Sequence, residues 1–358
     1  MKKKMVSLFL TACLFVSSSA LTVSASNYNT ANFQNTQYFS NEINANDQQL
    51  SHSSNDNVSN ATGETILTRY SDGTISKTVY DNSELSTINC DEEQQSLPEY
   101  LPDNQIISAA SVSSDEYGRE LTNPTDNRVG LLICGFNIDD DPDIDIYYEG
   151  TASLQNYDLL ISCAHVVWQP QYTNLDSDGW ANEITFYAGR SGDNTYSTKA
   201  NFSNISISQN YVDNTTYYID DDGYAVVSAA HDWDWSFIQI DRNLGGMYGW
   251  FGLHGCGPVE TGVDIYTIGY PDDKDSHTQW TSFGEITSFV SDNIVIYNAF
   301  IRKGNSGGPI LNNGQLYGIA SLYVENNGSW KYSGGTRIYD GLFGLILEAR
   351  EASAARWE

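Results

Sequence analysis

The hydrophobic and polar positions divide the chain into three parts, of which the last is the most regular. From residue 111 onward, short runs rich in β-branched and aromatic residues, such as RVGLLICGF, DLLISCAHVV and WSFIQI, are separated by turns rich in Gly, Asp and Asn. Roughly a dozen such runs in about 250 residues, without helical periodicity between them, favour antiparallel barrels or sandwiches over a parallel α/β sheet. The sequence therefore predicts an all-β domain over residues 111–358.

The end of the chain departs from this pattern. In DGLFGLILEAREASAARW the apolar residues recur at helical spacing behind Asp340, a residue type that caps helices, and they are Leu342, Leu345, Ile346 and Ala349. We expect a C-terminal helix over about residues 340–356, packed on the last barrel.

Residues 26–110 form the second part and have a different composition. Their first half is rich in Asn, Ser and Gln without any period, which is typical of a weakly ordered segment. From Thr65 the stretch TILTRYSDGTISKTVY reads as two strands joined at an SDG turn. A weakly ordered segment before a dense domain suggests a pro-region that is removed after export.

The first 25 residues have the layout of a secretory signal. A basic tip precedes an apolar run, and small residues follow at Val23-Ser24-Ala25, so we expect cleavage after Ala25. The stretch LTAC also fits a lipoprotein box in which Cys13 is lipidated, although the apolar run continues past Cys13. Both alternatives predict export, and we expect a secreted, extracellular protein with no contact to the membrane once the signal is removed.

Composition and charge narrow the range of functions. The 358 residues include 46 Asp and Glu against 17 Lys and Arg, a net charge of −29 that repels nucleic acid and anionic lipid. The hydrophobic content of 40% is sufficient for a real core. These values exclude a nucleic-acid-binding protein.

One serine has surroundings suited to chemistry. In IRKGNSGGPI, glycines leave the space around Ser306 open, but a serine hydroxyl needs a base, and the base needs an orienting partner. All five histidines precede Ser306, which excludes the α/β-hydrolase order of serine, acid and histidine.

Of the five histidines, His165 is the candidate base, because it closes the apolar strand DLLISCAHVV, where a side chain can be held rigidly at a cleft. In HDWDWSFIQI both Asp232 and Asp234 could orient it, and we choose Asp234 because it directly precedes a strand.

These motifs resemble a known family. SCAHVV, DWSFIQI and GNSGGPI, in the order His165, Asp234 and Ser306, resemble the trypsin/chymotrypsin-fold serine proteases, and most closely their secreted bacterial glutamyl-endopeptidase-like branch. IGYPDDK between acid and serine, and GTRI near the end, add to the likeness. The resemblance implies two six-stranded antiparallel β-barrels with the catalytic triad in the cleft between them.

The same resemblance assigns roles to individual residues. His165 would act as general base and then general acid, Asp234 would orient its ring, and Ser306 would form the acyl-enzyme. The backbone N–H groups of Gly304 and Ser306 would form the oxyanion hole. The enzyme would be a secreted serine endopeptidase that acts on peptides and proteins, and we expect a monomer without a cofactor.

Maturation is also suggested by the resemblance. SVSSDEYGRELTNPT is similar to the mature start of the glutamyl-endopeptidase-like enzymes, so we expect cleavage near Ala110 or Ser111. Trypsin-like enzymes pair a freed amino terminus with an Asp before the nucleophile, whereas this chain has the uncharged Asn305. We therefore expect activation to be independent of such an ion pair.

Substrate preference is predicted from the residues around Ser306. Glutamyl-specific relatives hold a threonine and a histidine in the pocket, and the corresponding positions here are Ile301 and Ala320. A pocket bounded by Phe300, Ile301, Ala320 and Ser321 favours uncharged, apolar side chains before the cleaved bond, because a buried anion without partners is costly.

Two alternatives stay open at this point. Glutamate specificity could be rescued if Arg302, Lys303 or Arg337 turned into the pocket. A non-catalytic secreted binding module on the same fold would be suspected if a triad position were missing.

Two further groups of residues are candidates for binding or bridging. Asp141, Asp143 and Asp145 alternate as in an EF-hand, but Ile146 and Ala152 replace its glycine and glutamate, so we predict no EF-hand and no metal. A looser calcium site at these acids or at residues 220–222 stays open.

A bridge between Cys134 and Cys163 is conceivable in an exported protein. The odd count of three with Cys256 and the apolar strands around them favour free thiols.

Overall fold

The computed structural model describes most of the chain after residue 113 and two segments before it. The described residues are 64–80, 97–102, 114–138, 143–173, 178–221, 224–255, 259–274, 277–326 and 328–357, together with the backbone of β1 (Thr11–Ala12) and β2 (Thr36–Tyr38). The predicted signal peptide and the predicted cleavage site near Ala110 and Ser111 therefore stay predictions, and Cys256, Asp141 and Asp222 lie outside the described residues.

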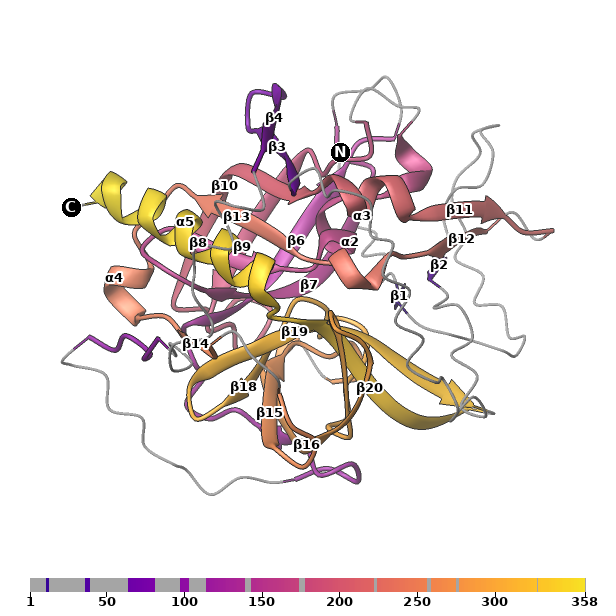
Figure 1. Ribbon diagram of the computed structural model, residues 1–358, viewed down its shortest axis with the longest axis vertical. Helices are drawn as coiled ribbons and strands as arrows, with labels where there is room; N and C mark the ends of the chain where they lie inside the picture. The colour runs from indigo at the N-terminus through magenta and orange to yellow at the C-terminus, as the bar shows by residue number, and fades with distance from the viewer. Residues whose placement is uncertain are drawn as a thin grey trace, which may run out of the picture.

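The first barrel is a closed antiparallel sheet built from the apolar runs of the first half of the domain (Figure 1). Each strand alternates between the barrel interior and the outer face. Strand β8 is buried at every position. In order around the barrel, the strands are β6 (Val129–Phe136), β7 (Ile146–Leu154), β8 (Leu159–Ser162), β13 (Ser236–Ile240), β10 (Thr198–Ser208) and β9 (Glu183–Ala188).

The second barrel follows the same plan. Its interior is filled by Ile265, Ile286, Val295, Ile310 and other residues of one hydrophobic cluster. Its strands, again in order around the barrel, are β15 (Asp264–Gly269), β16 (Trp280–Ser291), β17 (Ile294–Tyr297), β20 (Ser329–Arg337), β19 (Gln315–Asn326) and β18 (Pro309–Asn312). The prediction of an all-β fold with two closed six-stranded antiparallel barrels is confirmed.

Short elements connect and extend the barrels. They are β5 (Glu120–Leu121), β11 (Thr216–Ile219), β12 (Ala225–Ser228), β14 (Gly252–Leu253), α2 (Ala164–Val167), α3 (Gln209–Asn214), α4 (Gly245–Tyr248) and the 3₁₀ turns η1 (Pro170–Tyr172) and η2 (His231–Trp233). No helix in the described part of the chain has the length and apolar character needed to span a membrane.

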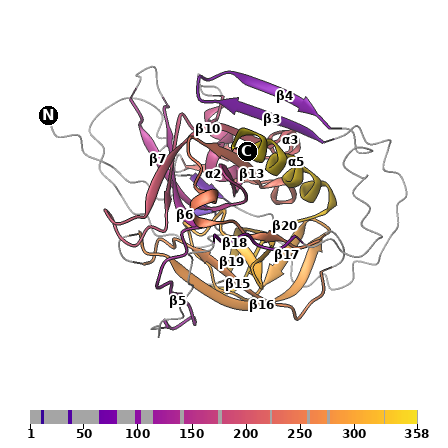
Figure 2. The same cartoon turned by 90° about the vertical axis from the view of Figure 1, so that its left-hand side faces the viewer.

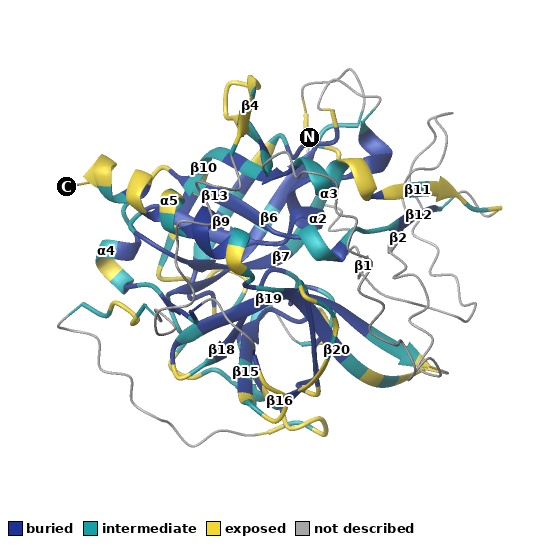
Figure 3. Cartoon of the chain, viewed as in Figure 1, coloured by how far each residue is buried: buried dark blue, intermediate teal, exposed yellow. Residues whose placement is uncertain are grey.

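The hairpin predicted from Thr65 is confirmed, and it is built into the first barrel. Strands β3 (Thr65–Tyr70) and β4 (Ile75–Val79) pair with each other, and β3 also pairs with the end of β10 beyond β9. Figure 2 shows the two strands extending from β10 beside the C-terminal helix. The base of the hairpin is buried and its far strand is exposed (Figure 3).

The C-terminal helix α5 (Asp340–Trp357) is confirmed, but its predicted position on the last barrel is wrong. Arg350 donates hydrogen bonds to Gln155 Oε1 and to the carbonyl of Phe251, 2.8 and 2.6 Å long. Arg356 forms an ion pair of 2.8 Å with Asp158. Gln155 and Asp158 lie in the β7–β8 turn, so the polar side of the helix finds its partners on the first barrel. Asp340 is the first helical residue and not the cap.

Cys134 and Cys163 are free thiols, as the odd cysteine count suggested. Both are fully buried, and burial raises the pKa of each thiol above its ordinary value. They act as small apolar residues of the core.

Candidate active site

His165 lies where the most buried strand of the first barrel ends. Strand β8 passes into α2, a single helical turn that carries His165, and the side chain is buried with 4% of its surface exposed. Its backbone N–H donates to Asp234 Oδ1 over 2.9 Å, and its carbonyl accepts from Gln169. The ring is therefore held by its own backbone as well as by its side-chain partner.

Asp234 faces this ring from the end of the η2 turn, two residues before β13. Its Oδ2 lies 2.6 Å from His165 Nδ1, and the carboxylate has no exposed surface. Burial alone raises the pKa of Asp234, but the interactions with His165 outweigh burial and bring the pKa well below its ordinary value. The carboxylate is thus a buried anion that accepts a hydrogen bond from Nδ1–H. The other ring nitrogen, Nε2, is then the one that can accept a proton.

Asp232, the other acid considered from the sequence, points elsewhere. Its Oδ1 accepts a hydrogen bond from Ser291 Oγ over 2.5 Å. Only Trp233 lies between the two acids, and the η2 turn directs their side chains to different neighbours.

A second histidine contacts the same carboxylate, and the sequence reasoning missed it. His231 Nδ1 lies 3.0 Å from Ser321 Oγ and 3.8 Å from Asp234 Oδ2. The available signal was its position three residues before Asp234 across a one-turn element, which brings both side chains to the same side. The partner Ser321 is distant in sequence and could not be found that way.

Ser306 lies in a tight turn that two glycines make possible. Gly304 has φ +83° and Gly307 has φ +88°, conformations that side chains rarely adopt. A Cβ on Gly307 would lie 2.0 Å from the carbonyl of Thr151 and 2.1 Å from Ser162 Oγ. The turn is therefore pressed against β7 and the end of β8, three residues from His165, while Ser306 keeps part of its surface exposed.

The turn is fixed from both sides by hydrogen bonds. The N–H of Thr151 donates to the carbonyl of Ser306 over 2.7 Å, and Thr151 Oγ1 donates to the carbonyl of Gly304, also over 2.7 Å. Asn305 is buried and its side-chain oxygen accepts from the N–H of Arg302. Within the described residues, the N–H groups of Gly304 and Ser306 donate no hydrogen bond, so both are available to a ligand.

The residues predicted to line the substrate pocket are all buried. Ile301 and Ala320 belong to the hydrophobic cluster of the second barrel, and Ser321 is bonded to His231. Phe300 stacks on Tyr117 with ring centroids 3.9 Å apart. The ring of Phe300 is thus already covered by the segment before the first barrel.

Three cationic side chains could have bound an acidic substrate side chain in the pocket, but each lies beside other groups of the protein. Arg302 forms an ion pair with Glu325, whose side chain is 4% exposed. Arg337 lies beside His254, and burial lowers the pKa of both groups. Lys303 lies beside Asp272, where burial raises the pKa of the carboxyl and the charge of Lys303 opposes that rise.

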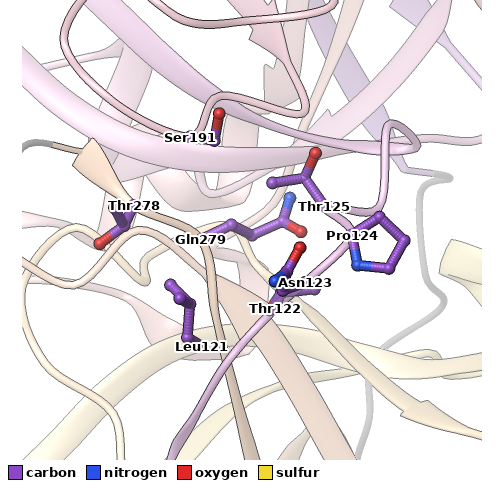
Figure 4. A pocket seen from close by; sticks show the side chains of 8 residues that line it. All are labelled: Leu121, Thr122, Asn123, Pro124, Thr125, Ser191, Thr278 and Gln279. Atoms are coloured by element: carbon purple, nitrogen blue, oxygen red, sulfur yellow. The ribbon is translucent and has the colours of Figure 1, made fainter. Parts of the chain in front are cut away.

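The structure has one pocket at the turn of Ser306 and another that involves none of the residues of this turn. One, of about 210 Å³, opens directly beside Gly304 and is lined by Glu149, Asp193, Tyr270, Pro271, Asp272, Lys274 and His277. The other, of about 360 Å³, contains none of the predicted site residues; Gln279 and the segment 121–125 line it (Figure 4).

Cys163, His165 and Asp234 place possible metal-ligand atoms within 4.8 Å of one another. The Cys163 thiol donates to the carbonyl of Ala320, and its raised pKa keeps it protonated. His165 and Asp234 are therefore an imidazole and carboxylate pair packed against a neutral thiol. A metal ion would require the thiolate form of Cys163.

One family model and several solved structures are similar to parts of this chain. Residues 150–319 match the family model of the trypsin-like peptidase domain. Among solved structures, similar chains include a Glu endopeptidase in complex with MPD, with 20% identity and a TM-score of 0.49 over 67% of this chain and 96% of that chain. Protease Anisep from Arthrobacter Nicotinovorans is 14% identical, with a TM-score of 0.47 over 66% and 99% of the two chains. No curated protein matches the sequence significantly. Residues 150–319 are thus similar to a trypsin-like peptidase domain, and this match supports a serine protease of the trypsin/chymotrypsin fold.

Proposed function

We propose that this protease cleaves peptide bonds through Ser306, His165 and Asp234 by way of an acyl-enzyme. The observation that carries the proposal is the 2.6 Å contact between His165 Nδ1 and the fully buried carboxylate of Asp234. A carboxylate in that position sets the tautomer of the ring and stabilises the imidazolium that forms during the reaction.

The reaction proceeds in two halves. Ser306 Oγ attacks the peptide carbonyl carbon while its proton passes to His165 Nε2, and the N–H groups of Gly304 and Ser306 stabilise the oxyanion. When the C–N bond breaks, His165 gives that proton to the leaving amine. Water then attacks the acyl-enzyme, again with His165 as base, and the acid product and free Ser306 are released.

Hydrolysis of a denatured protein substrate tests these roles. We expect Ser306→Ala and His165→Ala to reduce kcat by at least about 10⁴-fold while circular dichroism and the melting temperature stay close to those of the wild type. Folded Ser306→Ala protein with wild-type activity would exclude this nucleophile, and an inactive processed wild type would favour the non-catalytic binding module.

For specificity, we propose a preference for uncharged, apolar side chains before the cleaved bond. The support is that Ile301 and Ala320 present no polar group, and that Arg302 is already paired with Glu325. An acidic substrate side chain would be desolvated without a partner, at a cost of several kcal/mol.

A peptide library provides the test of specificity. Cleavage after Leu, Phe or Tyr is expected to dominate in the wild type. Dominant cleavage after Glu would overturn the apolar preference and establish the glutamyl alternative. Because the library reads the position of each cut, this result does not depend on which residues perform catalysis.

We also propose that the chain is made as an exported precursor that is cut after Ala25 and again near Ala110 or Ser111. The support is the layout of residues 1–25 and the change of composition near residue 110. Sequencing the amino terminus of the secreted protein decides this, because a fully active protein that starts at Ser26 would contradict the second cut.

A further inference from the structure

Two segments that precede the expected second cut are built into the protease domain. These are residues 64–80, which form the β3–β4 hairpin, and residues 97–102, and we call them together the N-terminal clamp. We propose that the N-terminal clamp stays bound without a covalent link after the chain is cut near residue 110, and that it supports the elements carrying His165 and Asp234. The second half of this proposal rests on the proposed triad, whereas the first half does not.

The hairpin adds a strand to the first barrel. Strand β3 pairs with β10 from Ile66 opposite Ser208 to Tyr70 opposite Asn204, at the part of β10 that β9 leaves unpaired. Ile66 is buried at the base of the hairpin, and Thr68 Oγ1 lies 2.8 Å from Ser206 Oγ. Strand addition of this kind gives affinity through main-chain hydrogen bonds. Without β3, this edge of β10 would be exposed.

The second segment of the clamp pairs with the chain just before and within β14. Leu97 and Leu253 exchange two backbone hydrogen bonds of 2.9 Å, and Tyr100 and Trp250 exchange two more of 3.0 and 2.9 Å. The rings of Tyr100 and Trp250 are also stacked, with centroids 4.3 Å apart. The contact is therefore specific in register.

Glycines of the protease domain make room for this segment. A Cβ on Gly249 would lie 2.0 Å from the carbonyl oxygen of Tyr100, and one on Gly252 would lie 2.2 Å from that of Leu97. A Cβ on Gly314 would lie 2.8 Å from the carboxylate of Glu99. The nearest atoms to all three glycines belong to the bound segment, so the domain leaves room for it at these positions, and the positive φ of Gly249 and Gly314 also disfavours a side chain there.

A buried charge of the protease domain also has its partner in the clamp. The Arg128 side chain is 5% exposed, and it pairs with Asp126 at 2.7 Å and with Glu99 at 2.5 Å. Loss of the clamp would leave the Glu99 side of this guanidinium exposed to solvent or unpaired, and a buried charge without its partner is strongly unfavourable.

One contact of the hairpin leads to the element that carries His165. The buried Arg69 donates a hydrogen bond of 2.6 Å to the carbonyl of Ala181. The N–H of Ala181 donates in turn to the carbonyl of Val167, the last residue of α2. Arg69 thus holds the segment against which the His165 helix rests.

Another contact leads to the turn before Asp234. Ser208 Oγ donates to Glu64 and accepts from the N–H of Asn210, which caps α3. Thr215, the residue after α3, accepts through Oγ1 from the N–H of Ala230, directly before the η2 turn. The clamp therefore contacts the supports of both residues of the His165 and Asp234 pair.

Cutting the chain on purpose tests retention of the clamp. A recognition sequence for a site-specific protease is inserted between residues 103 and 113 of the full chain bearing Ser306→Ala, and the cut protein is passed through a native gel-filtration column. We expect both pieces in one peak and their separation only in denaturant. Separation under native conditions would overturn the proposal, whether or not the protein is a protease.

Two matched variants in otherwise wild-type protein test the support of the catalytic residues. Arg69→Ala should lower kcat about tenfold with little change in KM, because the substrate does not contact it and only the geometry of catalysis is altered. Lys77→Ala, on the exposed strand of the same hairpin, should leave kcat unchanged. Equal kcat values for Arg69→Ala and the wild type, with both folded, would overturn the positioning role of the clamp.

Discussion

At the scale of single residues, the site depends on one buried negative charge. Asp234 has no exposed surface, yet interactions with His165 keep its pKa low, so the carboxylate is charged when the ring needs a partner. His231, which is bonded to Ser321, approaches the same carboxylate oxygen as His165 does. The acid is thus held in place by two histidine side chains and one backbone N–H.

We predict that Asp234→Asn lowers kcat by about 10³ to 10⁴-fold with a small change in KM, because an amide favours the wrong tautomer of His165. Asp232→Asn is the matched control, since Asp232 contacts Ser291 instead, and its kcat should stay within about twofold of the wild type. Steady-state kinetics on one peptide substrate provides the comparison. Equal losses in both variants would show that Asp234 has no special role.

Gly304 supplies a second residue-level prediction. Its φ of +83° disfavours any side chain, and a Cβ would lie 2.1 Å from the carbonyl of Tyr270. Gly304→Ala should therefore displace the N–H that we assign to the oxyanion hole and reduce kcat about 100-fold or more. Gly262→Ala is the control, because Gly262 has φ +81° with open space around it. That variant should lose about 1 kcal/mol of stability and keep its kcat, whereas parallel losses of activity would point to backbone strain alone.

At the scale of elements, ion pairs between side chains connect strands and loops that share no backbone hydrogen bonds, and His277 is an example. His277 Nε2 lies 3.0 Å from Glu149 on β7, and His277 Nδ1 lies 3.0 Å from Asp193 in the loop after β9. The hydrogen bond with Glu149 is the largest cause that raises the pKa of His277 above its ordinary value. This histidine lines the pocket beside Gly304, so the pair also shapes the surroundings of the site.

The sign of the His277 effect follows from that raised pKa. The contribution of His277 to the free energy of unfolding is fully present below the pKa of an unfolded histidine, about 6.5. It is lost as the pH rises through the higher pKa of His277 in the folded protein. We predict that His277→Gln costs up to about 1 kcal/mol at pH 5.5 and much less at pH 9. Melting temperatures of the two proteins across this range measure the effect, and a difference that grew toward high pH would contradict it.

The docking of α5 can be tested in the same way. Asp158 is 2% exposed and accepts from Ser353 and Arg356 of the helix. Burial alone raises the pKa of Asp158, but these bonds outweigh it and the net pKa is lowered. Asp158→Asn should cost about 2 kcal/mol in chemical denaturation near pH 7. Glu351→Gln, on the exposed face of α5, should cost little. Similar costs for the two variants would mean that the ion pair does not anchor the helix.

At the scale of the whole molecule, the barrels, the C-terminal helix and the hairpin could be predicted because each follows from a local pattern. Alternating apolar runs predict strands, and SDG between two such runs predicts the hairpin. The order of His165, Asp234 and Ser306 identified the family motifs. What failed was the placement of α5, because its partners Gln155 and Asp158 are almost 200 residues away and carry no sequence signal.

Contacts between residues far apart in the sequence also explain why some neighbours of the site could not be predicted. The contact of His231 with Ser321 and the addition of β3 to β10 join segments 90 and more than 130 residues apart. The burial of Phe300 beneath Tyr117 likewise depends on how a distant segment folds back. Local patterns therefore located the reactive side chains, but not the residues that hold or cover them.

The central claim is that Ser306 is an activated nucleophile in the folded protease, and labelling with a fluorophosphonate tests it most directly. These reagents phosphonylate serines whose proton is removed by a neighbouring base, because the serine oxygen attacks phosphorus and displaces fluoride. We predict one label per processed chain, located on Ser306 by mass spectrometry, absent from Ser306→Ala and from heat-denatured protein. A folded and processed wild type that stays unlabelled, or carries its label on another serine, would contradict the account.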